Sequence, residues 1–299
     1  MLGMFRAYRE RGWREISPAE YAHCWEQWGG SVITHPRIVE RLALLAEIPV
    51  RYLGWPATGQ LQAAIPTWGQ HLALAKAVLK RKGKRGLYDL GNAEVILPMA
   101  ANAQIDLRFK AENLSERSAA QIKQAQAHPF GLALARAPED YSKKFRYNQR
   151  RELRLLEEAG GKIRDIQQLT PVERATIYSQ LFEQRWSFDV PGKQHLSEVF
   201  TLLDEFMTGS VLYLAEQPIA IQILYKVQSP QWISVEYVNG GVAPDHKDFS
   251  PGSVLSFINT QAEWQLAKAA GKTLRYSFGR DEQAYKQRWC HSSAIYFTR

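Results

Sequence analysis

Four residues near the end of the chain carry side chains that acyl transfer to an amine would use. The acceptor must release a proton, the developing oxyanion needs hydrogen-bond donors, and the departing group often needs an acid. Glu236 is the best candidate for the base, and Asp281 is the second. Tyr285 could protonate a leaving group, and Lys286 could hold a phosphate or a carboxylate. These four residues are therefore candidates for acid–base and anion-binding chemistry in the C-terminal half.

Each of these residues also has an ordinary structural explanation. Glu236 lies between Val235 and Tyr237 in an expected strand, where successive side chains alternate and a carboxylate commonly faces water. Tyr285 and Trp289 are four residues apart and would pack on one helical face, which would leave Lys286 in solvent. The residue types alone leave both explanations open.

A helix start at Ser250-Pro251-Gly252-Ser253 is the candidate binding site for the donor. The first turn of a helix has unpaired backbone N–H groups and a positive dipole end, which together bind phosphate groups. Ser250, Gly252 and Ser253 are therefore candidates for contacts with a pyrophosphate. Serine and proline also begin helices that bind nothing, so the motif alone does not decide.

The elements that must position these residues predict a mixed α/β protein. In the C-terminal half, β-branched and aromatic residues indicate consecutive antiparallel strands at 211–215, 219–227 and 232–238, with the first turn at Gln217-Pro218. A helix over 250–270 and a strand over 273–278 follow. Before them we expect a short strand at 132–135 and helices over 142–159, 171–186 and 194–207.

The N-terminal half also mixes helices and strands. A capping box at Ser17 and Glu20 opens a helix over 17–28, and a second helix is expected over 36–46. Apolar spacing predicts further helices over 71–79 and 115–126. Extended segments are expected at 50–54, 61–67, 94–99 and 104–109. We place the boundary between two lobes at 128/129, so that the lobes span 1–128 and 129–299.

Composition excludes several classes of protein. The 299 residues are 45% hydrophobic and 23% charged, which is typical of a folded chain. Cys24 and Cys290 lie far apart without the spacing of a zinc site, so we predict no metal. No apolar stretch has the length of a membrane span, and the first residues lack a signal-peptide pattern. We expect a cytoplasmic protein.

Positive charge gathers in two short segments of a chain whose formal net charge is +8. The candidates for binding an anionic partner are Lys80, Arg81, Lys82, Lys84 and Arg85 in the first segment, and Lys143, Lys144, Arg146, Arg150 and Arg151 in the second. Such clusters bind RNA phosphates or anionic lipid headgroups, and they also occur as solvated helix faces. We expect an anionic membrane surface or envelope component as the partner, with tRNA as a further candidate, and no DNA.

Residues 138–289 resemble the GNAT-like acyltransferases of the cellulose-biosynthesis and FemAB-related type. The matching pieces are Tyr141-Ser142-Lys143-Lys144 with Asn148 and Arg151, Pro218-Ile219-Ala220, Ser250-Pro251-Gly252, and the block from Phe278 to Trp289. This resemblance implies two tandem GNAT-like lobes, the first degenerate, with largely antiparallel sheets flanked by helices. It implies acyl-CoA as the donor, or aminoacyl-tRNA as in FemAB relatives. The GNAT pattern Arg/Gln-x-x-Gly-x-Gly/Ala is absent from 248–253.

The whole chain, including Gly29-Gly30-Ser31-Val32 and Thr34-His35-Pro36, further resembles the macrophage-induced-gene-fourteen family of bacterial proteins. That resemblance implies resistance to cationic antimicrobial peptides and peripheral association with the inner membrane. Two hypotheses follow. The chain is a transferase that modifies an amine or hydroxyl of an envelope component, or it is a degenerate transferase fold that binds at the membrane as a scaffold.

Overall fold

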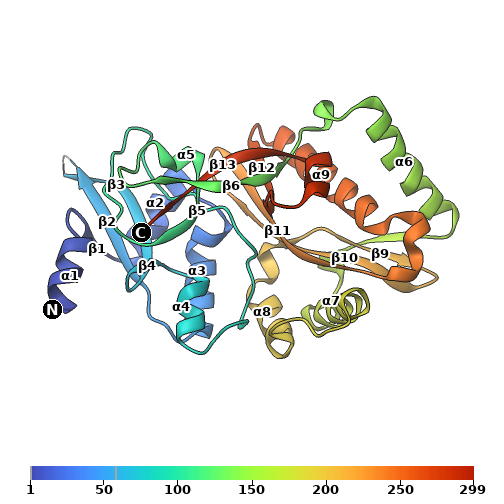
Figure 1. Cartoon of the computed structure of the whole chain (residues 1–299), viewed down its shortest axis with the longest axis horizontal. Helices are drawn as coiled ribbons and strands as arrows, with labels where there is room; N and C mark the ends of the chain where they lie inside the picture. The colour runs from blue at the N-terminus through green and yellow to red at the C-terminus, as the bar shows by residue number, and fades with distance from the viewer. Residues whose placement is uncertain (1, 58) are drawn as a thin grey trace.

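The computed structural model describes residues 2–57 and 59–299. Figure 1 shows the N-terminal elements at one end of the long axis, and strands β9, β10 and β11 with helices α6, α7 and α9 at the other. The side chains before residue 6 lie outside the description.

The first sheet is small and antiparallel, with strand order β1-β2-β3-β4. Its strands are β1 (Arg14–Ile16), β2 (Arg51–Ala57), β3 (Gln60–Trp68) and β4 (His71–Leu72). Helices α2 (Pro18–Trp28) and α3 (Pro36–Leu45) lie beside it, after α1 (Leu2–Arg9). The predicted capping box is present, because Ser17 Oγ accepts the Glu20 N–H and the Glu20 carboxylate accepts the Ser17 N–H.

The second sheet has nine strands among the described residues and carries the predicted core of the C-terminal half. Its order is β5-β13-β6-β12-β11-β10-β9-β7, with β8 paired to β10. The strands are β5 (Ala111–Ser115), β6 (Gln126–Ala135), β7 (Lys162–Asp165), β8 (Met207–Thr208), β9 (Ser210–Leu214), β10 (Gln217–Gln228), β11 (Trp232–Val242), β12 (Thr273–Arg280) and β13 (Cys290–Thr298). The antiparallel pairing of β9, β10 and β11 confirms the prediction.

The larger helices of the C-terminal half also match their predictions. They are α6 (Lys143–Glu158), α7 (Pro171–Trp186) and α9 (Pro251–Ala269). Helix α9 packs on β10, β11 and β12, as expected. The predicted helix over 194–207 is shorter, because α8 (Leu196–Leu202) passes through a 3₁₀ turn into β8. The turn of the β9–β10 hairpin lies at Ala215 and Glu216, which both have positive φ. The predicted turn residues Gln217 and Pro218 belong to β10 instead.

Two helix predictions for the N-terminal half were wrong. The helix over 71–79 is reduced to α4 (Lys76–Arg81), because Leu74 has a φ of 64° and residues 71–72 pair in β4. The segments expected to be extended at 94–99 and 104–109 pair through isolated bridges, at Val95 and Met99 in the first and at Ile105 in the second. The helix over 115–126 is reduced to α5 (Glu116–Ala119), because the backbone at 121–123 bonds to Ile105.

The two halves of the chain share structure across the expected boundary. Strand β6 crosses residues 128 and 129, and β5 joins the second sheet through β13. One hydrophobic core contains Tyr21 and Ile38 from the first half together with Val211 and Leu255 from the second. The division into two repeated lobes stays a prediction.

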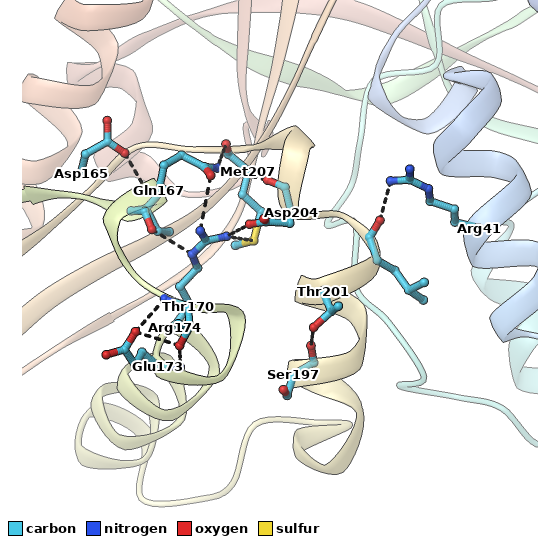
Figure 2. A network of polar contacts seen from close by, with 12 residues as sticks. Arg41, Asp165, Gln167, Thr170, Glu173, Arg174, Ser197, Thr201, Asp204 and Met207 are labelled. Carbon is cyan, nitrogen blue, oxygen red and sulfur yellow. Dashed lines mark hydrogen bonds and ion pairs between the residues drawn. The ribbon is translucent and has the colours of Figure 1, made fainter.

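A buried polar network fixes the start of α7 (Figure 2). The Arg174 side chain is 1% exposed, donates from Nε to the Ile166 carbonyl at 2.8 Å, and pairs with Asp204. Gln167 donates to the Met207 carbonyl at 2.7 Å. Because a buried guanidinium needs these partners, the network sets the position of α7 and of its far end at Trp186.

Candidate functional site

The two central strands of the second sheet separate, and a pocket opens between them. Strands β11 and β12 pair in parallel from Trp232 and Thr273 to Glu236 and Ser277. Beyond this point β11 remains paired with β10, and β12 remains paired with β6. The pocket holds about 1120 Å³. Among the described residues, the edge of β11 that faced β12 has no strand partner beyond Glu236, and the Gly240 N–H there donates to Asn239 Oδ1 at 2.8 Å.

A bulge marks the place where the strands separate. Tyr237 is opposite Leu224 and Asn239 is opposite Ile223, which leaves Val238 without a partner in β10. A Cβ atom on Gly91 would lie 3.3 Å from the Val238 Cα, so the loop before β5 lies directly on the bulge. The first half of the chain therefore contributes one wall of the pocket.

The start of α9 lines the pocket through Ser250, Gly252 and Ser253, as the sequence led us to expect. Few backbone donors remain there, however. The N–H groups of Ser253 and Val254 donate to the Ser250 carbonyl, and Pro251 has no N–H. In this turn the Gly252 N–H and the two serine hydroxyls are left for a ligand. That set is poorer than the run of donors a pyrophosphate usually meets at a helix start.

A chain of amide and hydroxyl groups forms the floor beside α9. Asn259 donates to Gln222 Oε1 at 2.8 Å, and Gln222 donates to Ser256 Oγ at 2.7 Å. Gln222 and Ser256 line the pocket, and all three residues are buried. These bonds join α9 to β10 and hold the floor rigid. No motif in the sequence indicated them.

Tyr285 and Lys286 lie together at the opening, on the short turn predicted for them. Tyr285 is 55% exposed, and partial burial raises the pKa of its phenol. Lys286 Nζ donates to the carbonyls of Phe278 and Arg280 at 2.6 and 2.5 Å, and burial lowers the pKa of the amine. Lys286 therefore holds the end of β12 and is not solvated.

Glu236 does not line the pocket. Its side chain is 2% exposed and points to the face of β11 opposite that of Tyr237. The carboxyl group accepts the Glu94 N–H at 2.8 Å. Burial and then the nearby charge of Glu94 raise its pKa well above the usual range. The solvated strand carboxylate considered above is excluded by this burial.

Asp281 does not line the pocket either. Its carboxylate accepts the Gly131 N–H at 2.9 Å and the hydroxyl proton of Ser292. These bonds fasten the end of β12 to β6 and β13. The structure thus brings together Tyr285, Lys286 and the start of α9, and it places both predicted carboxylates elsewhere.

The first half of the chain and α7 supply pocket residues that sequence reasoning missed. Asp89 is the carboxylate among the described residues that line the pocket, and its Oδ1 lies 3.0 Å from Lys76 Nζ. Arg185 and Trp186 line the same side, with the guanidinium 4.7 Å from the indole centroid. No local motif joins residues so far apart in the chain. The packing of loop 89–92 at Val238 and the packing of α7 on β11 bring them to one pocket.

The two basic segments lie on different sides of the molecule. In Figure 1, α4 lies along one long side with α7 and α8, whereas α6 lies toward the other. The exposed cations that form no ion pair with a described residue are Lys80, Arg81, Lys82 and Arg85 near α4, and Lys143, Lys144, Arg150 and Arg151 on α6. Lys84 pairs with Glu47, and Arg146 donates to the Pro138 carbonyl.

Comparisons with known proteins support the fold that this geometry indicates. The Mig-14 family model matches residues 35–298. FemX, compared by structure, has a TM-score of 0.56 and 9% identity over 95% of this chain and 96% of that one. L-PGS from Bacillus licheniformis has a TM-score of 0.51 and 14% identity over 95% and 92%. No curated protein matches the sequence.

These likenesses confirm the expected fold class. The chain has a mixed α/β, GNAT-like fold with largely antiparallel sheets flanked by helices. None of the helices within residues 2–57 and 59–299 is long and apolar enough to cross a membrane.

Proposed function

The chain belongs to the Mig-14 family, as the sequence resemblance indicated, and on this basis we propose that it transfers an acyl or aminoacyl group within the pocket between β11 and β12. The observation that carries the proposal is the separation of these strands at the start of α9. It places the edge of β11 beyond Glu236, a helix start and a phenol around one space. Acyl transfer needs hydrogen-bond donors for the oxyanion and an acid for the departing group, and Asp89 in the same pocket adds the base.

The proposed reaction joins an acceptor nitrogen or oxygen to the donor carbonyl carbon. The bond from that carbon to the donor's sulfur or ribose oxygen breaks, and the free edge of β11 after Glu236 stabilises the oxyanion. Asp89 takes the acceptor's proton, because it is the carboxylate at the pocket wall. Tyr285 gives a proton to the departing group.

Two features favour aminoacyl-tRNA over acyl-CoA as the donor. The start of α9 keeps one free backbone N–H beside two hydroxyls, which suits a pyrophosphate poorly. The basic helix α6 contacts α9 and the turn at Pro244–Phe249 that leads into Ser250. A nucleic-acid backbone could therefore lie along α6 while its 3′ end enters the pocket. Acyl-CoA remains the other donor to test.

We further propose that the acceptor is an envelope component and that the product raises tolerance to cationic peptides. A protein with a net charge of +8 would repel such peptides, so modifying a target fits better than sequestering them. The protein would act at the cytoplasmic face of the inner membrane, held there peripherally.

Label transfer tests the proposal. The purified protein is incubated with membranes and with either radiolabelled aminoacyl-tRNA or radiolabelled acyl-CoA. We expect the label to move to a membrane component. The Asp89→Asn variant should slow transfer by roughly 10²-fold or more and leave donor affinity unchanged, with partial recovery in Asp89→Glu.

A catalytically degenerate binding protein is the second candidate, and the sparse donors at α9 favour it. Cells that depend on the protein for peptide tolerance distinguish the two. If cells carrying Asp89→Asn with Tyr285→Phe keep full tolerance, and no label moves from either donor, the binding protein is correct and the transferase is not.

A further inference from the structure

The pocket opening carries two exposed aromatic side chains on one short stretch of chain. Trp186 ends α7 and lines the pocket, and Phe188 follows two residues later; they are 47% and 54% exposed. Their ring centroids lie 6.4 and 5.4 Å from that of the buried Phe182. We call Arg185, Trp186 and Phe188 the aromatic rim. Two exposed aromatic rings that pack on the same buried ring beside a pocket are candidates for contact with a partner.

The aromatic rim is held by the fold. Ser187 adopts the left-handed conformation at φ 58° and donates its N–H to the Glu183 carbonyl at 2.7 Å. The loop then packs at Gly192, where a Cβ atom would lie 1.8 Å from the Gly86 carbonyl oxygen. Because the rings are presented by ordered backbone, binding through them costs little conformational entropy.

The same contact joins the aromatic rim to the basic segment of the first half. Gly86 directly follows Arg85, so the exposed cations Lys80, Arg81, Lys82 and Arg85 lie on the chain that packs against the rim loop. Helices α4, α7 and α8 lie along one side of the molecule in Figure 1. Tryptophan beside arginine, next to further exposed cations, is typical of surfaces that meet the headgroup region of a bilayer.

We propose that this surface docks on an anionic lipid bilayer, with Trp186 and Phe188 in the headgroup region. The exposed cations near α4 contact anionic headgroups, and the pocket opens toward the membrane. An acceptor would then reach Asp89 from the bilayer, so it is a lipid-anchored molecule whose polar head enters the pocket. This last step rests on the proposed transferase function, whereas the docking does not.

Vesicle sedimentation tests the docking without any donor. Vesicles of phosphatidylcholine alone are compared with vesicles that also contain phosphatidylglycerol, at low and high salt. Trp186→Ser with Phe188→Ser should lower binding to the anionic vesicles by about tenfold or more at both salt concentrations. Changing Lys80, Arg81, Lys82 and Arg85 to Gln should lower binding strongly at low salt and little at high salt.

Helix α6 offers matched controls. Tyr147 is 62% exposed, so Tyr147→Ser removes an exposed ring of similar size away from the rim. Changing Lys143, Lys144, Arg150 and Arg151 to Gln removes the same number of charges as the α4 variant. Both controls should sediment like the unchanged protein. Docking through α6 instead would make these controls lose binding, and would overturn the proposal.

A dye attached at one site gives an independent measurement, because it reports contact with the bilayer while the protein remains bound. Cys24 and Cys290 are buried, which raises their thiol pKa to about 11 and about 12, so an added cysteine reacts selectively. An environment-sensitive dye on Phe188→Cys should shift to the blue with anionic vesicles, and the same dye on Tyr147→Cys should not. The absence of a shift at 188 contradicts the proposal. The proposal is also contradicted if the Trp186→Ser, Phe188→Ser variant keeps its binding to vesicles but loses binding to RNA.

Discussion

At the scale of single residues, Glu236 and Glu94 share one buried compartment between the halves of the chain. Arg275 pairs with Glu94 at an Nε–Oε2 distance of 2.8 Å, and Glu236 accepts the Glu94 N–H. Arg275 is shared by Glu94, Glu116 and Glu236, and burial, followed by the charge of Glu94, disfavours the charged form of Glu236 and raises its pKa. Glu236 thus joins the two halves in its protonated form.

This protonation makes folding depend on pH. Above the ordinary pKa near 4.5 the unfolded chain releases the Glu236 proton, while the folded chain retains it because the folded pKa is raised. The unfolded state then binds fewer protons, so stability falls as the pH rises toward the folded pKa. Glu236→Gln removes this dependence. We expect the variant to gain up to about 1.4 kcal/mol on the unchanged protein for each pH unit in this range.

Urea unfolding at pH values from about 5 to 8 measures the difference. Glu157→Gln is the control, because that residue is exposed on α6, forms no ion pair with a described residue and should leave the pH dependence unchanged. Parallel stability curves for the unchanged protein and Glu236→Gln would contradict the assignment of a neutral Glu236.

At the scale of elements, α7 depends on the buried Arg174. The side chain serves both the Ile166 carbonyl and Asp204, so Arg174→Met leaves that carbonyl without its bond and removes an ion pair. We expect a loss of roughly 2–4 kcal/mol in the free energy of unfolding. Arg154→Met, whose partner Glu158 lies on the surface of α6, should cost less than about 0.5 kcal/mol. Equal effects in denaturant unfolding would show that the network does not stabilise α7.

The sequence predicted elements well where their signals are local. Helix α2 begins at the residue indicated by its capping box, α7 spans the predicted range 171–186, and α9 begins after Ser250 as its proline suggested. The helix over 115–126 failed because Ile105, ten or more residues earlier, takes the backbone bonds at 121 and 123. Apolar spacing does not reveal such competition.

The residues of the candidate site were likewise predictable only where the signal is local in the sequence. Tyr285, Lys286 and the start of α9 were predictable, because each lies in a recognisable local segment. Asp89 was not, since it reaches the pocket only when Gly91 packs on the bulge at Val238, almost 150 residues further along the chain. The burial of Glu236 was not predictable, because the alternation of side chains along a strand does not reveal which face of the strand the other half of the protein covers.

At the scale of the whole molecule, the positive charge is divided between two surfaces that are not adjacent (Figure 1). The surface near α4 includes the aromatic rim, whereas α6 contacts α9 near the donor end of the pocket. One flat partner would not contact both. We therefore assign the bilayer to the first surface and the polyanionic donor to the second.

Binding of tRNA measured over a range of salt concentrations tests this assignment. Changing Lys143, Lys144, Arg150 and Arg151 to Gln should reduce the slope of log affinity against log salt by up to roughly 3, because each lost phosphate contact removes released counterions. Changing Lys80, Arg81, Lys82 and Arg85 to Gln should leave the slope nearly unchanged. The reverse result would exchange the roles of the two surfaces.

The central claim is that a donor binds in the pocket at the start of α9, and calorimetry with one matched pair of variants tests it most directly. Ser253→Glu puts a carboxylate at the third position of α9, where it favours the helix but repels a phosphate. Gln265→Glu adds the same charge at an exposed position of the same helix. We predict that aminoacyl-tRNA or acyl-CoA binds the unchanged protein and Gln265→Glu alike, and at least about tenfold more weakly to Ser253→Glu. Equal binding by all three proteins, or binding of neither donor to the unchanged protein, would contradict the claim.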